Sequence, residues 1–172
     1  MTGTDPPPPA RSFARLAGAA IGTMLGDALG MPVEGWPPER IRAVHGRVER
    51  LLPGRLPAGS YTDDSQMMIA ILETLAHRGR LDPAYLAGRF LALHQPERGY
   101  GRRIAEVMRR IAQGRSWEQV GGDSWGNGGA MRVGVLGAVY PEDEATLLRA
   151  ALDQCRVTHH HPQALAGAAA LA

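Results

Sequence analysis

Apolar side chains recur at helical spacing along most of this chain, and glycine or proline separates one such stretch from the next. The clearest stretch is Asp63 to His77, in which Met68, Ile71, Leu72 and Leu75 follow the i, i+3, i+4, i+7 pattern of one helix face. No segment shows the apolar and polar alternation of a half-buried strand. The pattern predicts an all-α, multi-helix bundle.

Glycine, proline and short polar residues give the expected helix boundaries. Ser12 is the expected N-cap of the first helix, and Asp82 is that of the fourth. The segments 46–61 and 121–129 are rich in proline or glycine and are predicted to be irregular. The predicted helices cover residues 13–30, 38–45, 63–77, 83–94, 102–113, 130–140, 142–157 and 162–172.

The size of the chain suits one domain. It has 172 residues, 44% of them hydrophobic and 21% charged, as in ordinary globular proteins. Residues 1–11 hold four consecutive prolines and are predicted to form a disordered tail, which leaves residues 12–172 for the all-α domain. The last stretch, LAGAAALA, stops in mid-pattern without a helix-ending signal. We therefore expect the domain to be incomplete at its C-terminus.

Charge and cysteine content limit the partners and the compartment. Lysine and arginine number 19 against 17 aspartates and glutamates, a net charge of +2 that does not favour nucleic acid. The single cysteine, Cys155, cannot form an internal disulfide, so we expect a cytoplasmic location. Asp27, four glycines and Pro32 interrupt the most apolar segment, 16–33, so no membrane helix is expected.

Two carboxylates and two hydroxyls are crowded at the start of the clearest helix, at Thr62, Asp63, Asp64 and Ser65. One interpretation is capping, because acids near a helix N-terminus are stabilised by the helix dipole by about 0.3–1 kcal/mol. The other is a site for a hard cation, because adjacent carboxylates repel each other and carboxylate oxygens are ligands that magnesium or calcium prefers.

Two further acids, Asp27 and Glu34, flank Pro32, the proline that ends the first predicted helix. An acid within a glycine- and alanine-rich helix is destabilising unless it is paired. The structural interpretation is a hydrogen-bonded carboxylate at Asp27 and an exposed loop acid at Glu34.

The segment from Ser124 to Arg132 leads a glycine-rich turn into an expected helix start. Backbone amides left free at such a point make an anion site, and the Trp125 ring can stack on a base. A tight turn without a ligand is the alternative interpretation.

Three consecutive histidines, His159 to His161, come later in the chain. They project in different directions from either a helix or a strand, so they do not make one metal site. A solvated run is the structural interpretation.

Five blocks together resemble, in the same order, those of the ADP-ribosylglycohydrolase family, which includes ADP-ribosyl-acceptor hydrolases and dinitrogenase-reductase-activating glycohydrolases. RGYG with SWGNGGAMR is closer to the branch that removes O-linked ADP-ribose than to the arginine-specific branch. The resemblance covers nearly everything after the proline-rich tail. The blocks are GDALGMPVE (26–34), TDDS (62–65), RGYG (98–101), SWGNGGAMR (124–132) and THHHPQA (158–164).

The resemblance implies an all-α bundle around two magnesium ions and a hydrolase that removes ADP-ribose from modified proteins or related conjugates. It implies that Thr62, Asp63 and Asp64 bind metal and that Glu34, Asp63 and Asp64 are catalytic. The substrate-binding residues that it implies are Gly99, Tyr100, Gly101, Ser124, Trp125, Gly126, Asn127, Gly128 and His159.

The sequence also departs from the family pattern. The family's THPDP block is THHHP here, so only His159 inherits a role. Family members carry further Asp-x-Asp-Thr ligands late in the chain, and no such block follows Thr158. We therefore expect this chain alone to bind at most one magnesium ion well. The alternatives are a relative that binds ADP-ribose or is structural without catalysis, and a helical interaction module. Unpaired helix faces are expected to promote self-association.

Overall fold

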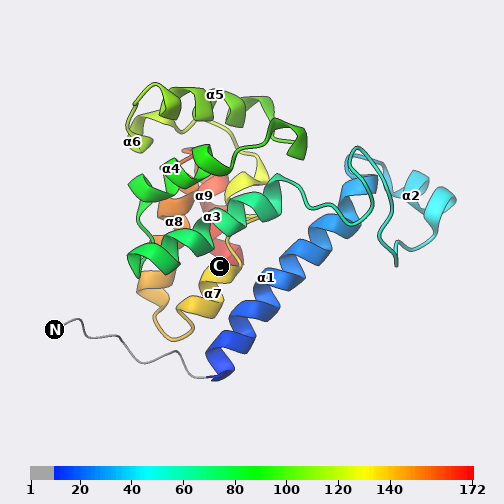
Figure 1. The fold of residues 1–172 in the computed structure, drawn as a ribbon, viewed down its shortest axis with the longest axis horizontal. Helices are drawn as coiled ribbons and strands as arrows, with labels where there is room; N and C mark the ends of the chain where they lie inside the picture. Colours follow the sequence, from blue (N-terminus) through cyan, green and yellow to red (C-terminus); the bar gives the residue numbers. More distant parts are fainter. Residues whose placement is uncertain (1–9) are drawn as a thin grey trace.

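Helices form the secondary structure of residues 10–172, the part of the chain that this computed structural model describes (Figure 1). Within this range there is no strand, and one isolated bridge joins Gly122 to His159. The predicted all-α fold is therefore confirmed. The α-helices are α1 (Ala10–Gly30), α2 (Pro38–His45), α3 (Asp63–Arg78), α4 (Pro83–Leu93), α5 (Arg102–Ala112), α6 (Trp117–Val120), α7 (Val135–Val139), α8 (Glu144–Arg156) and α9 (Pro162–Leu171), and the 3-10 helices are η1 (Met31–Val33), η2 (Pro96–Arg98) and η3 (Asn127–Gly129).

Most helix boundaries follow from local capping, as the sequence predicted. α2 has the predicted bounds. α3 ends at Gly79, whose φ of 68° lies in the left-handed region that favours glycine. At the start of α4, the Asp82 carboxylate accepts a hydrogen bond from the amide of Tyr85 at 3.1 Å. The end of α3 and the start of α4 therefore need no tertiary contact.

Other boundaries differ from the predictions. α1 begins at Ala10, so Ser12 lies inside the helix and is not its N-cap. The rest of the predicted disordered tail, residues 1–9, lies outside the described residues. The predicted helix 130–140 is helical only over α7, because residues 130–134 form turns that direct Arg132 into the core, where it bonds to α8. The short helix α6 was not predicted.

The hydrophobic core is built around α3. Its buried Met67, Met68 and Ile71 share one cluster with Leu86 and Phe90 of α4. The helices α3, α4, α7, α8 and α9 form the body of the molecule, and α5 and α6 lie together at one end of it (Figure 1). A second, smaller cluster joins α8 to α9 through Cys155, Ala164 and Ala168. The start of α3 lies close to the glycine-rich loop 124–129, because Asp63 and residues of that loop line the same cavity.

α1 runs along one side of this body, and α2 lies beyond its C-terminal end (Figure 1). Leu16, Ala19 and Met24 pack against the main core. On the other face of α1, Ile21 and Leu25 are 57% and 51% exposed. One face of this apolar helix is thus without a partner among the described residues.

Among the described residues, Ser12–Val33 is long and apolar enough to cross a membrane by length and composition alone, although Asp27, the glycines and Pro32 predicted no membrane helix. A mostly buried core helix and an N-terminal signal sequence meet the same criterion, and this segment lies near the N-terminus with 11% of its window buried. In this structure Asp27, within the segment, holds the start of α3 through hydrogen bonds. The absence of a membrane partner stays a prediction.

Candidate active site

The first turn of α3 is held by a side chain from α1. The Asp27 carboxylate accepts hydrogen bonds from the amide and hydroxyl of Thr62, at 2.8 and 2.6 Å, and from the amide and hydroxyl of Ser65, at 3.2 and 2.5 Å. Thr62, the N-cap residue, makes no side-chain cap of its own. Asp27 therefore serves amides that a local cap would otherwise serve, which confirms the structural interpretation of Asp27.

Asp63 and Asp64 line a cavity at this end of α3. Burial, and then the neighbouring charge of Asp64, raise the pKa of Asp63 to about 6. Burial, and then the charge of Asp27, raise the pKa of Asp64. Asp63 and Asp64 lie in the first turn of α3, where the helix dipole stabilises acids, so the capping interpretation also fits their position. The arrangement concentrates negative charge where a cation would relieve it.

The donor set at this point suits a hard divalent cation. Thr62 uses its hydroxyl proton toward Asp27, which leaves its oxygen lone pairs free, and Asp63 and Asp64 add carboxylate oxygens. Among residues 10–172, no group of three or more histidine, cysteine, aspartate or glutamate side chains is close enough together to hold a metal ion. Thr62, Asp63 and Asp64 are therefore the described residues that could supply oxygen ligands to a cation here.

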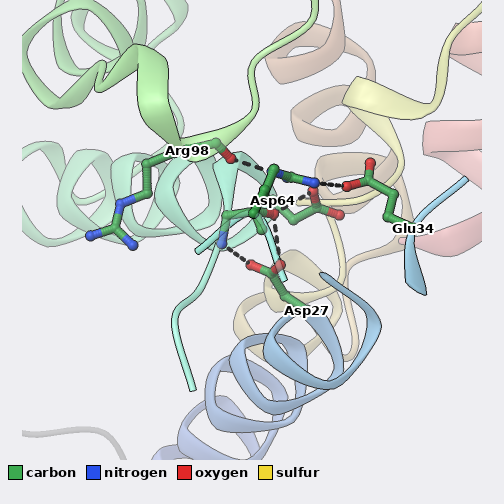
Figure 2. Close-up of polar contacts among 6 residues, drawn as sticks. Asp27, Glu34, Asp64 and Arg98 are labelled. Carbon is green, nitrogen blue, oxygen red and sulfur yellow. Dashed lines mark hydrogen bonds and ion pairs between the residues drawn. The ribbon is translucent and has the colours of Figure 1, made fainter. Parts of the chain in front are cut away.

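Glu34 lies on the wall of the same cavity, just after η1. It forms an ion pair with Arg55, whose guanidinium also donates to the carbonyl of Arg98 at 3.3 Å. In Figure 2, Asp64 lies between Asp27 and Glu34. Arg98 lies on the side of Asp64 that is opposite Glu34. Arg55 was not predicted, because it comes from the irregular segment 46–61 with no motif around it.

The predicted site residues meet around two adjoining cavities. The larger, of about 760 Å³, is lined by Glu34, Asp63, Asp64, Gly99, Gly101 and Asn127, among others. The smaller, of about 300 Å³, shares Asp63, Gly101 and Asn127 with it and adds Ser124, Gly126, Gly128 and His159. Blocks that are far apart in the sequence therefore form one continuous site. One end is acidic, and the other is bordered by loop 126–128 and by Arg102 and Arg103.

Two predicted substrate residues, Tyr100 and Trp125, line neither cavity. The Tyr100 hydroxyl donates to the Gln66 side-chain oxygen at 2.7 Å, and burial raises the pKa of this phenol above its ordinary value. Tyr100 thus fixes the turn between Gly99 and Gly101 to α3. Trp125 is 70% exposed, so its ring is open to a ligand but is not held over the site.

The glycine-rich loop is fastened to the segment that carries His159. The amide of Gly122 donates to the Thr158 carbonyl at 3.1 Å, and the amide of His160 donates to the Gly122 carbonyl at 2.9 Å. A Cβ at Gly128 would lie 2.5 Å from Cε1 of His159, so only glycine allows the loop to pack on this ring. His159 is 4% exposed, which contradicts a solvated histidine run at this position.

Comparison with known proteins agrees with this geometry. The family model described as ADP-ribosylglycohydrolase matches residues 8–172. The chain belongs to the ADP-ribosylglycohydrolase family. A solved structure titled "ADP-ribosylglycohydrolase-related protein complex" matches it with a TM-score of 0.74 and 32% identity, over 92% of this chain and 53% of that one. The family resemblance and the fold that it implied are therefore confirmed.

Curated relatives within the family match a similar length. An uncharacterized protein of Archaeoglobus fulgidus is 36% identical over 88% of this chain and 52% of its own length. The ADP-ribosyl-[dinitrogen reductase] glycohydrolase of Rhodospirillum rubrum is 33% identical over 86% and 52%. ADP-ribosylhydrolase ARH3 of Mus musculus is 31% identical over 76% and 40%. The chain thus spans about half the length, or less, of these relatives.

Proposed function

We propose that the two cavities bind an ADP-ribose conjugate and belong to a magnesium-dependent hydrolase that removes ADP-ribose from modified proteins. The observation that carries the proposal is the meeting of Glu34, Asp63 and Asp64 with the glycine-rich loop 126–128 around one continuous space. An acidic end beside a glycine-lined end suits a substrate with a sugar at one side and a pyrophosphate at the other. The family membership of the chain supports this choice of substrate.

Magnesium is the cation that the donor set favours. Thr62, Asp63 and Asp64 would hold it. Burial and neighbouring carboxylates raise the pKa values of Asp63 and Asp64, and a bound cation would favour their charged forms. When bound, magnesium would act as a Lewis acid on ribose hydroxyls and on water. Further ligands from the part of the family domain that this chain does not match would complete the pair of ions.

Glu34 is the group best placed to handle a proton. In hydrolysis, the bond from the anomeric carbon to the acceptor breaks, a water oxygen takes its place, and the departing group gains a proton. The Glu34 carboxylate would accept a proton from water. Its partner Arg55 contacts one carboxylate oxygen, so the other oxygen of Glu34 remains available to a proton.

The glycine-rich end would supply binding energy rather than chemistry. Without Cβ atoms at Gly126 and Gly128, a phosphate can approach the backbone amides closely. The exposed ring of Trp125 can fold over a base. Contacts to the remote ADP would then position the reacting ribose at the carboxylates. O-linked substrates and a cytoplasmic location remain part of this proposal.

A second candidate function is ADP-ribose binding without hydrolysis by this chain. It is favoured by one observation: the described residues include no cluster of three potential metal-ligating side chains of the kinds histidine, cysteine, aspartate and glutamate. A chain with half of the ligands would bind the nucleotide through the loop and turn over little of it. The two candidates share a binding site and differ in catalysis.

Calorimetry with ADP-ribose, with and without magnesium, tests the shared site. We expect wild type to bind ADP-ribose, and the double variant Asp63→Asn, Asp64→Asn to lose the effect of magnesium and about tenfold or more in affinity. The control is Glu142→Gln, which removes an exposed acid far from the site in sequence and should behave as wild type. Equal magnesium response in the double variant would refute the metal site.

Release of ADP-ribose from a modified peptide separates the two candidates. Turnover that needs magnesium and is lost in Glu34→Gln supports the hydrolase. Binding without release supports the second candidate. Absence of both binding and release would reject the proposed function.

A further inference from the structure

Arg132 is a fully buried cation without a carboxylate partner among the described residues. Its Nε donates to the Gln154 side-chain oxygen at 2.6 Å, and Nη2 donates to the Gln154 carbonyl and to the Thr158 hydroxyl, each at 2.8 Å. The guanidinium also lies 4.6 Å from the centre of the Phe90 ring. Burial lowers the pKa of Arg132 to about 10, so it remains charged at neutral pH. A charge buried at such cost calls for a reason beyond packing.

The Thr158 hydroxyl has one proton and two neighbours that could accept it. One is the Cys155 carbonyl at 3.4 Å, which already accepts the amides of Thr158 and His159 at 3.0 and 2.8 Å. The other is Nδ1 of His159 at 2.7 Å. Arg132 donates to the Thr158 hydroxyl oxygen, so the hydroxyl must direct its own proton to another acceptor. Because the Cys155 carbonyl already accepts two amides, that acceptor is Nδ1 of His159. The charge of Arg132 polarises the hydroxyl in this direction.

A histidine that accepts at Nδ1 carries its own proton on Nε2. Nε2 lies next to the glycine-rich loop: positions for a Cβ at Gly126 and Gly128 are 3.8 and 3.1 Å from it. The ring borders the smaller cavity. Within the described residues, no protein group forms a hydrogen bond with Nε2. The N–H is therefore directed to a place where a ligand can receive it.

We propose that Arg132 and Thr158 are positioning residues that fix His159 as the neutral tautomer with its proton on Nε2, so that the ring donates one hydrogen bond to an anionic oxygen of the ligand. The identity of the ligand rests on the proposed function, whereas the tautomer does not. After burial, the groups that lower the pKa of the His159 ring are Arg132, Arg103 and His160, while Asp63 and Arg102 lie on the wall of the same cavity. The three groups that lower it are basic and oppose a second proton on the ring.

Alternative roles for Arg132 explain less. A purely structural arginine could bond to Gln154 alone, and an apolar residue of similar volume would fill the same place more cheaply. The bond to Thr158 is the one that reaches the site, because Thr158 alone joins Arg132 to His159 in the hydrogen-bond network of residues 10–172. The chain of donors runs in one direction, from the guanidinium through the hydroxyl to the imidazole.

Long-range ¹H–¹⁵N spectra of the histidine side chains test the tautomer on the intact chain. At pH 7 we expect the His159 ring of wild type to show a protonated Nε2 and an unprotonated, hydrogen-bonded Nδ1. Thr158→Val keeps the shape and removes the hydroxyl, so the signal should move toward a mixture of tautomers. Thr158→Ser keeps the hydroxyl and should match wild type. A proton on Nδ1 in wild type, or an unchanged tautomer in Thr158→Val, would overturn the proposal.

ADP-ribose affinity tests whether the fixed tautomer serves binding. We expect about a tenfold weaker affinity for Thr158→Val and wild-type affinity for Thr158→Ser. Unchanged affinity in Thr158→Val, despite an altered tautomer, would overturn the donor role. If wild type binds no ADP-ribose, the proposed function fails, and the spectra still decide the tautomer. The wild-type spectrum needs no variant, so a poorly folded Thr158→Val cannot leave the question open.

Discussion

The carboxylate of Asp27 accepts hydrogen bonds from both the amide and the hydroxyl of Thr62. These bonds join α1 to the first turn of α3 across 35 positions of sequence. This one side chain places the two carboxylates that follow Thr62. It also explains why an acid is tolerated in a helix of glycine and alanine, because the carboxylate accepts hydrogen bonds from the amides of Thr62 and Ser65 and from both hydroxyls.

Asp27→Asn is expected to destabilise the protein and to displace the start of α3. An amide group presents an N–H₂ where Thr62 and Ser65 also present donors, so two donors would face each other. We expect a loss of about 2 kcal/mol in the free energy of unfolding, measured by urea denaturation. Asp123→Asn, at an exposed acid, is the control. A loss no greater than in the control would contradict the proposed anchoring.

Gly128→Ala is expected to weaken ADP-ribose binding through His159. The added methyl would come within 2.5 Å of Cε1 of the ring, so either the loop or the imidazole must move. We expect about 1–3 kcal/mol of destabilisation and a weaker affinity, measured by thermal unfolding and calorimetry. Gly134→Ala is a matched control, because a Cβ at Gly134 meets nothing within 4 Å. Equal ADP-ribose affinity in the two variants would show that the packing of Gly128 on His159 does not contribute to binding.

The sequence was informative where structure is local. The caps at Asp82 and Gly79 and the periodicity of α3 were predicted because each depends on nearby residues. Asp27 and Glu34 were recognised as candidates, but their partners Thr62, Ser65 and Arg55 come from distant segments. The buried position of Arg132 could not be predicted, because its position in SWGNGGAMR gives no sign of the contacts that it makes with α8. Tertiary contacts, not propensity, also shortened the predicted helix 130–140.

The burial of His159 predicts a pH dependence of stability. Burial, and then the charge of Arg132, lower the pKa of His159 to about 4, against 6.5 for an ordinary histidine. Between these values the unfolded chain binds more protons than the folded one, so stability falls as pH falls from 6.5 toward 4.

We expect a loss on the order of 2 kcal/mol from this group, measured by urea denaturation at several pH values. His159→Gln cannot titrate, and its curve should fall less steeply below pH 6.5. Its stability at pH 8 gives the packing cost separately. Parallel curves for wild type and variant would show that His159 is not held neutral by burial.

The exposed face of α1 predicts self-association. Ile21 and Leu25 are adjacent on one face and are 57% and 51% exposed, while the opposite face packs on the core. A contiguous apolar face of this kind favours association in water. We expect concentration-dependent oligomers in light scattering, and a shift toward monomer in the double variant Ile21→Ser, Leu25→Ser. Because neither side chain is in the core, the variant should unfold with a free energy within about 0.5 kcal/mol of the wild-type value.

Leu148→Ser, at a 44% exposed residue of α8, is the control and should leave the association unchanged. A monomeric wild type, or oligomers that persist in the double variant, would show that this face does not drive association.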